Sequence, residues 1–250
     1  MLDQAPFKIL GETPDVLAVE KPPFLLVHPS KPGGPITLWD RLKELLAYEI
    51  ASGGQVSLIN RLDRETSGIV LVAKHLEAAR ICAMAMERSQ IKKEYLAIVA
   101  GWPHREEWSV DAPILRLGEV QHSRIWLKRC IHPMGAVAKT DFRLEQVFTH
   151  PRYGPLALVR CWPRTGRTHQ IRVHLAHSGI PVVGDKIYGP SQECYLEFIN
   201  TGWTSGLEQQ LWLPRHALHS CVLGLTIGEI HHHWESALPG DLVRLLAACG

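Results

Sequence analysis

The order of apolar and polar positions predicts a chain of many short strands and few helices. The apolar runs Val16–Val19 and Ile69–Ala73 predict buried strands. Phe7–Leu10 precedes the first run across a turn at Gly11–Asp15, a pattern typical of a hairpin. Further strands are expected at Lys93–Val99, Ile125–Leu127, Val137–Phe148, Leu156–Trp162 and Ala217–Ile227.

Helical periodicity is confined to a few segments. A helix is expected from Leu38 to Ile50, with Thr37 as its N-cap. Because strands outnumber helices and do not alternate with them, the pattern favours an α+β fold over a doubly wound one. We expect one domain over residues 1–250, built on an extended, mixed, mostly antiparallel sheet. The other expected helices are Leu76–Ser89 with Leu76, Ala79, Ala83 and Met86 on one face, a short one capped by Thr168, Gln192–Thr201 capped by Ser191, and one after Asp241.

Composition narrows the class of protein. The chain is 46% hydrophobic and 21% charged, which is ordinary for a globular protein. No run approaches the ~18 apolar residues of a membrane helix, and the first residues lack a signal peptide's pattern, so we expect a cytoplasmic protein. The six cysteines are scattered without a Cys-x-x-Cys pair, which indicates neither a zinc site nor a disulfide framework.

The net charge of +2 does not by itself predict a nucleic-acid partner, but the placement of the charges is informative. Arg160, Arg164, Arg167 and Arg172 lie in a stretch that contains no acid before His177. A second acid-free stretch, from Ser123 to Lys139, adds four more basic residues. A locally basic face suits phosphate binding, although the residues alone leave solvated loops and strands as an alternative.

The segment Asn60–Gly68 contains the main candidate for a catalytic residue, Asp63, which lies between two arginines just before a predicted buried strand. A nearby arginine, such as one from the stretch Arg164–Leu175, would favour the ionised carboxylate. From composition alone, Asp63 could equally form a structural turn by bonding the backbone near Glu65.

Four motifs in order resemble the RluA-type family of RNA pseudouridine synthases. Asn60–Gly68 matches the family's His-Arg-Leu-Asp-x-x-Thr-Ser-Gly, and Thr165–His174 matches its Thr-Gly-Arg-Thr-His-Gln-Ile-Arg-x-His. Gly184–Gly189 matches Gly-Asp-x-x-Tyr-Gly, and Ala217–His219 matches Ala-Leu-His. The resemblance runs from about Ile9 to Ile227 and implies the family's fold, a mostly antiparallel sheet with flanking helices and a central cleft.

The resemblance implies an isomerase that converts specific uridines of structured RNA, either rRNA or tRNA, into pseudouridine. The atoms are the same before and after, so we expect no cofactor and no metal, and the chain has no Gly-x-Gly-x-x-Gly or Walker loop. RNA is the expected partner, with no membrane and no obligate protein partner.

The family's functional residues transfer to matching positions. Asp63 is the expected catalytic carboxylate, and Arg172 is its expected partner. Tyr95, in Lys93–Ala97, is expected to stack on the flipped uracil. Structural roles remain the alternative for Tyr95, as a core tyrosine, and for Arg172, as a surface arginine. The expected RNA-binding residues are Arg61, Arg164, Arg167 and His169.

Some features depart from the family. Asn60 stands where histidine is usual, and Pro23-Phe24 replaces a small residue and glycine. The N-terminal S4 domain of many relatives is expected to be absent. Asn60 favours a rival interpretation, an RNA-binding relative without catalysis; a nucleoside hydrolase would need paired acids. We interpret Trp102, Trp108, Trp126 and Trp162 as core residues, and His231–His233 as strand residues on alternating faces.

Overall fold

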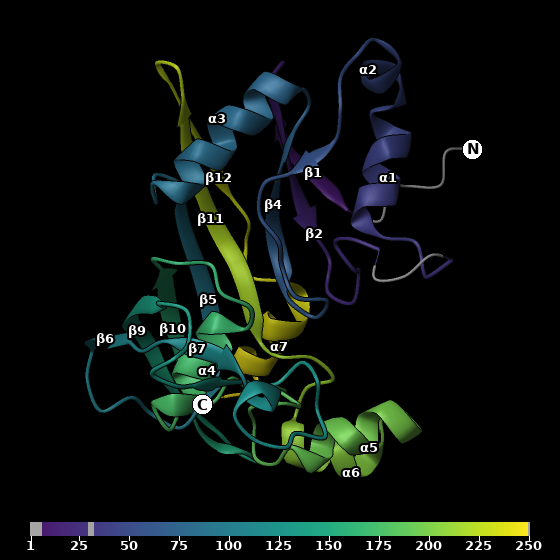
Figure 1. The fold of residues 1–250 in the computed structure, drawn as a ribbon. Helices are drawn as coiled ribbons and strands as arrows, with labels where there is room; N and C mark the ends of the chain where they lie inside the picture. The colour runs from purple at the N-terminus through teal and green to yellow at the C-terminus, as the bar shows by residue number, and fades with distance from the viewer. Residues whose placement is uncertain (1–6, 30–32, 250) are drawn as a thin grey trace. The chain divides into compact units, whose positions relative to one another are not determined.

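The computed structural model describes residues 7–29 and 33–249, and these divide into two compact units (Figure 1). The first unit contains residues 1–93 and 219–237, and the second contains 94–218 and 238–250. The chain passes between them three times. Two crossings lie inside the strands β5 (Lys92–Ala100) and β11 (Leu218–Ile227), and the third lies between Ala237 and Leu238. Each unit combines a sheet with separate helices, so the α+β prediction is confirmed.

The first unit is built on β4 (Ser67–Ala73), which is buried at every position. β2 pairs antiparallel along one edge of β4. The other edge is shared: β3 pairs antiparallel at Val72 and Ala73, while β11 pairs parallel at Ser67 and Gly68. The predicted hairpin and the predicted buried strand are both confirmed. The remaining strands are β1 (Lys8–Glu12), β2 (Val16–Lys21), β3 (Ser57–Leu58) and β12 (Ile230–Glu235), which pairs with β11.

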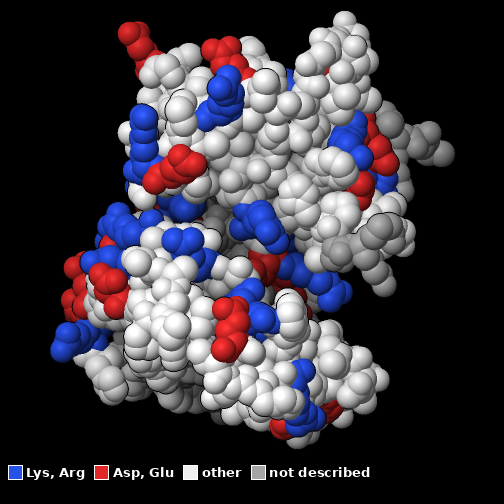
Figure 2. All heavy atoms as spheres, in the orientation of Figure 1, with Lys and Arg blue, Asp and Glu red and all other residues white. Residues whose placement is uncertain are grey.

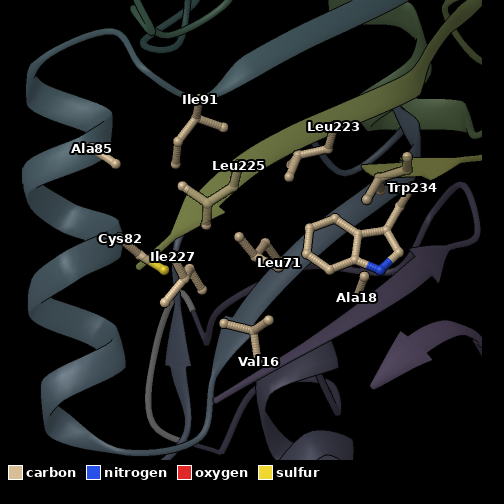
Figure 3. Close-up of a cluster of buried hydrophobic side chains, with 11 residues drawn as sticks. Val16, Ala18, Leu71, Cys82, Ala85, Ile91, Leu223, Leu225, Ile227 and Trp234 are labelled. Atoms are coloured by element: carbon tan, nitrogen blue, oxygen red, sulfur yellow. The ribbon is translucent and has the colours of Figure 1, made fainter. Parts of the chain in front are cut away.

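One face of this sheet is covered by α3 (Leu76–Glu87), which shares a core with β2, β4 and β11 (Figure 3). Ala78, Cys82 and Ala85 are the buried residues of α3, whereas Leu76 is 63% exposed. The predicted apolar face was therefore wrong for Leu76 and Ala83, which are exposed, whereas Met86 does pack against this core. Alanines occur on several faces of this helix and do not mark one. The core cluster contains Val16, Ala18, Ile69, Leu71, Cys82, Ala85, Ile91, Leu223, Leu225, Ile227 and Trp234.

The helix expected at Leu38–Ile50 is two helices, α1 (Leu38–Leu45) and α2 (Ala47–Ala51). Leu46 separates them with φ −98° and ψ 26°, outside the helical range. Thr37 is the predicted N-cap, and with Asp40 it forms a reciprocal capping box.

The second unit has strand order β5-β10-β9-β6, all antiparallel. A separate two-stranded sheet is formed by β7 and β8. In the described residues, no helix of either unit has the length and apolar character needed to cross a bilayer. The elements are β6 (Glu107–Asp111), β7 (Ile114–Arg116), β8 (Arg129–Ile131), β9 (Lys139–His150), β10 (Gly154–Pro163), α4 (Gln170–His177), α5 (Glu193–Thr201), α6 (Ser205–Leu211) and α7 (Gly240–Ala247).

Several predictions in this unit were wrong. The N-cap of α5 is Gln192 rather than Ser191, and the helix begins at Glu193. Ile125–Leu127 is a turn rather than a strand, with Ile125 buried and Trp126 exposed. The N-cap of α4 is His169 rather than Thr168, and His169 adopts the left-handed conformation with φ 59°. Sequence patterns did not reveal β3, β6, β7, β8 or α6, which are short or partly polar. The interpretation of His231–His233 as strand residues is confirmed, because they lie in β12.

Candidate functional site

Asp63 lies in the loop that joins β3 to β4 in the first unit, and it is partly exposed. Its backbone carbonyl accepts a hydrogen bond from the Thr66 amide at 3.1 Å, which closes a turn. The buried ammonium of Lys21 donates to the Arg64 carbonyl at 3.2 Å and to the Leu25 carbonyl at 3.0 Å. The loop is therefore held to the end of β2, which limits how far the Asp63 backbone can move.

Asn60 fixes the other side of this loop. Its side-chain amide donates to the Ile69 carbonyl at 3.0 Å, and its side-chain oxygen accepts from the Leu71 amide at 2.8 Å. These two backbone groups lie on β4 between the positions paired with β3 and those paired with β11. The Asn60 carboxamide thus replaces a strand partner where the shared edge has a gap.

The start of β4 is fixed against β11 by Gly68. Gly68 has φ 112°, and a Cβ there would lie 2.2 Å from the Ser220 carbonyl oxygen, so only glycine fits. Beside it, the Ser67 hydroxyl is 2.9 Å from Nδ1 of buried His219, whose Nε2 is 3.1 Å from the Ser236 carbonyl oxygen. Since a carbonyl can only accept, Nε2–H donates to Ser236, and Nδ1 accepts from Ser67.

Arg61 is exposed on the same loop. Burial lowers the pKa of His28, and the Arg61 charge lowers it further. The Arg61 guanidinium therefore lies close enough to act on the His28 ring, and it favours the neutral imidazole.

In the second unit, Arg172 projects from α4 and is 4% exposed. Its Nε donates to Asp185 Oδ2 at 2.6 Å and its Nη2 donates to Oδ1 at 2.8 Å, a two-point salt bridge. Burial alone raises the pKa of Asp185, but the Arg172 charge and hydrogen bonds outweigh it and hold that pKa far below its ordinary value. The idea of Arg172 as a surface arginine is wrong; its guanidinium is an oriented, buried cation.

Tyr188 links this ion pair to the rest of the predicted RNA-binding segment. The Arg172 guanidinium lies 5.1 Å from the centre of the Tyr188 ring. The Tyr188 hydroxyl accepts from the Arg129 amide at 2.8 Å and lies 2.8 Å from His169 Nδ1. The hydroxyl proton is thereby available to His169, and one phenol orients both the histidine and the arginine.

Gln170 organises the turn before α4. Its side-chain oxygen accepts from the Thr165 hydroxyl at 2.6 Å and from the Arg167 amide at 3.0 Å, and its amide donates to the Lys139 carbonyl at 2.9 Å. With the turn fixed this way, the Arg164 and Arg167 side chains lie exposed. Arg164 pairs with Asp141 at 2.6 Å.

Tyr95 lies on β5 opposite Cys161 of β10 and is 8% exposed.

His174 is fully buried, with Nε2 donating to the Ala112 carbonyl at 3.0 Å and Nδ1 accepting from the Thr140 hydroxyl at 2.9 Å. Burial is the main reason that the pKa of His174 is lowered. The histidine at the end of the predicted motif is therefore a neutral structural residue.

The structure places the predicted residues in two groups. Asp63 and Arg61 belong to the first unit, on the loop before β4. The second group, around β10 and α4, holds Arg164, Arg167, His169 and Arg172, with Tyr95 on the neighbouring strand β5. Figure 2 shows lysine and arginine side chains on the face in view, with acidic side chains among them.

Sequence reasoning assigned no role to several residues that support these groups. The motif Gly184–Gly189 was recognised, but its Asp185 and Tyr188 were not connected to Arg172 and His169. The chemical signal was present, because an acid and a phenol lie close in sequence to a dense arginine segment. In the described residues, no group of three histidine, cysteine or acidic side chains is arranged to hold a metal ion.

Comparison with known proteins connects this arrangement to one family. Residues 15–177 match the family model described as RNA pseudouridylate synthase. The chain is 34% identical over 249 residues to ribosomal large subunit pseudouridine synthase D of Nitrosomonas europaea, covering 97% of this chain and 65% of that protein. It is 35% identical over 256 residues to the protein of that name from Yersinia pestis, covering 98% and 71%.

Solved structures agree on the fold. Human RNA Pseudouridylate Synthase Domain Containing 1 superposes with a TM-score of 0.73 at 22% identity, covering 98% of this chain and 89% of the other. Human RNA Pseudouridylate Synthase Domain Containing 4 gives 0.72 at 24% identity, covering 96% and 92%. At these identities, the two human structures establish a shared fold.

Proposed function

The chain belongs to the family of RNA pseudouridylate synthases, and we propose that it isomerises specific uridines of large-subunit ribosomal RNA, with Asp63 as the catalytic carboxylate. The sequence left rRNA and tRNA open. The names of the bacterial relatives favour large-subunit rRNA, and we place the protein with that RNA in the cytoplasm. The chain spans about two thirds of the length of these relatives, 65% of one and 71% of another.

The observation that carries the assignment of Asp63 is the way its loop is held. Lys21 fixes the loop to β2 and Asn60 fixes it to β4, while the Asp63 side chain stays partly exposed. A carboxylate on a fixed backbone is positioned for chemistry at low entropic cost. We propose that it either forms a transient bond to the flipped nucleotide, which later breaks, or removes a sugar proton and returns it. In either case the N1–C1′ bond breaks, C5 joins C1′, C5 loses its proton and N1 gains one.

We further propose that Tyr95 and Arg172 act in the same reaction, and that both units belong to one catalytic domain. The two-point salt bridge with Asp185 fixes the orientation of the Arg172 guanidinium. Such a cation would keep Asp63 ionised. Tyr95 would stack on the uracil. Arg61, Arg164, Arg167 and His169 would bind the surrounding RNA.

The test is conversion of a large-subunit rRNA transcript by purified protein, read by carbodiimide labelling and reverse-transcription stops. Wild type should produce one or a few specific stops. Asp63→Asn should produce none while binding the transcript with nearly unchanged affinity, because phosphate contacts dominate binding. Glu65→Gln, which removes the other acid of this loop, is the matched control and should retain activity.

The same assay separates the rival functions. A non-catalytic RNA-binding relative would bind the transcript and leave no stop with wild-type protein. A nucleoside hydrolase would release uracil from free uridine. Full activity in Asp63→Asn would overturn the assignment of the carboxylate.

A further inference from the structure

The exposed indole of Trp126 is the feature of the second unit that the proposed chemistry does not use. Trp126 is 75% exposed on the turn between β7 and β8, contrary to the prediction that it is a core residue. The Arg116 guanidinium carbon lies 3.7 Å from the centre of the indole ring. The two side chains therefore form a stacked pair of flat groups at the surface.

This pair forms one wall of a hollow of about 260 Å³. The other lining residues are Gly118, Gln121, His122 and Ser123, most of which carry hydrogen-bonding side chains. An amide, an imidazole and a hydroxyl beside an aromatic wall are the groups that recognise the edge and the face of an unpaired base.

The turn that carries Trp126 is ordered rather than loose. The neighbouring Ile125 is 1% exposed and packs with Ile187 and Leu196. The Ser123 hydroxyl accepts a hydrogen bond from the Ile125 amide at 3.2 Å and donates one to the Ile125 carbonyl at 3.0 Å. A large aromatic side chain held exposed by a fixed turn loses little entropy when a ligand stacks on it.

Local charge favours an anionic ligand. Between Glu119 and Asp141 the chain has no acid, and this stretch contributes Arg124, Lys128 and Arg129. Arg116 and Arg124 pair with Glu119 at 3.2 Å and Glu193 at 3.0 Å. These ion pairs are largely at the surface and contribute little stability, so a phosphate can compete with them.

We propose that Trp126 and Arg116 form a stacking platform for an unpaired base of the RNA substrate. The neighbouring phosphates would contact the basic residues between Glu119 and Asp141. This proposal rests on the proposed function, since it assumes an RNA substrate. It assigns the platform to RNA binding and not to the isomerisation step.

The experiment measures the affinity and the rate of Trp126→Ala on an in vitro transcript of large-subunit rRNA. Stacking of one base contributes roughly 1–3 kcal/mol, so the affinity should fall roughly 5- to 150-fold. KM should rise while kcat at saturating RNA stays that of wild type. Trp126→Phe, which keeps a smaller stacking surface, should recover part of the affinity. Trp102→Ala removes another exposed tryptophan, 50% exposed and outside the hollow, and should change neither quantity.

A comparison of RNA that contains unpaired bases with duplex RNA distinguishes base stacking from electrostatic attraction to phosphates. The loss in Trp126→Ala should appear with RNA that contains unpaired bases and be absent with a continuous duplex of equal length. Unchanged affinity of Trp126→Ala for the transcript would overturn the proposal. So would a defect seen on ribosomal particles but not on naked RNA, because that would assign the platform to a protein partner. RNA affinity is measured without turnover, so an inactive wild-type protein would refute the proposed function and leave this test intact.

Discussion

Arg172 and Asp185 form a buried salt bridge in which both oxygens of one carboxylate accept from one guanidinium, at 2.6 and 2.8 Å. Asp185 Oδ1 also accepts from the Ile187 and Tyr188 amides, so the carboxylate belongs to its own tight turn. That turn needs Gly184, whose added Cβ would lie 1.9 Å from the Arg215 carbonyl oxygen. The orientation of Arg172 is therefore set by the loop Gly184–Gly189, which follows α4 closely in the sequence.

Asp185→Asn should lower both stability and turnover. It leaves a buried arginine without its counter-charge, and breaking such a pair costs about 3–5 kcal/mol. At a temperature where both proteins are folded, kcat should fall more than RNA affinity, since Arg172 loses its fixed orientation. Glu193→Gln, which removes a partner from the exposed Arg124 pair, should cost about 1 kcal/mol or less. Equal losses in the two variants, measured by urea unfolding, would contradict the special role of Asp185.

The Asp185 pair should also give stability a specific pH dependence. The pKa of Asp185 in the folded chain lies below its ordinary value of 3.8, so the unfolded chain takes up the proton first. The contribution is therefore complete above about pH 5 and is lost as the pH falls below 4. The difference in unfolding free energy between wild type and Asp185→Asn should be constant from pH 7 to 5 and shrink at lower pH.

His174 should make the protein less stable in mild acid. Its pKa is lowered from 6.5, chiefly by burial, which outweighs the hydrogen bond to the Ala112 carbonyl that acts to raise it. The unfolded chain binds the proton more readily, so stability is present above pH 6.5 and is lost as the pH falls. The decrease in unfolding free energy from pH 8 to 5.5 should be smaller in His174→Gln than in wild type. His104→Gln, at an exposed position, should leave the wild-type slope unchanged.

The sequence alone was sufficient to predict those strands and helices that combine a strong hydrophobic pattern with a clear polar boundary. The run Ile69–Ala73 is apolar at every position and follows a polar loop, and it is the buried strand β4. α3 was located correctly, but its buried face was not, because Ala78, Cys82 and Ala85 are no more apolar than the alanines beside them. The hydrophobic pattern of α3 does not identify its buried face, because packing against the neighbouring strands decides which face is buried.

Other features depend on contacts between distant segments. The role of Asn60 requires knowing that β3 and β11 share one edge of β4 and leave a gap between them. The start of α4 depends on His169 adopting φ 59°, which a non-glycine residue accepts here because Tyr188 contacts its ring. Neither arrangement is encoded by a local pattern.

Phe24→Gly should stabilise the protein. Phe24 has φ 69°, a left-handed conformation that costs an L-residue about 1–2 kcal/mol, and the family usually has glycine here. Its side chain is 43% exposed, so little burial is lost on its removal. Glycine also increases the entropy of the unfolded chain by roughly 0.5–1 kcal/mol, which leaves a net gain of about 0.5–1 kcal/mol. Phe24→Ala keeps the backbone strain and should show no gain, and equal unfolding midpoints for the two variants would argue against the strain.

Asn60→His tests how the departure from the family motif is tolerated. A neutral imidazole has one donor and one acceptor, which can serve the Ile69 carbonyl and the Leu71 amide in place of the carboxamide. A protonated imidazole has two donors and leaves the Leu71 amide without an acceptor, at a cost of about 1–3 kcal/mol. We therefore expect Asn60→His to be active at pH 8 and to lose activity below about pH 6.5, where wild type keeps more of its rate. Asn60→Ala removes both bonds and should lose activity and stability at both pH values. The measurement is pseudouridine formation against pH for the three proteins, and a pH profile of Asn60→His identical to that of wild type would mean that the loop does not depend on these two hydrogen bonds.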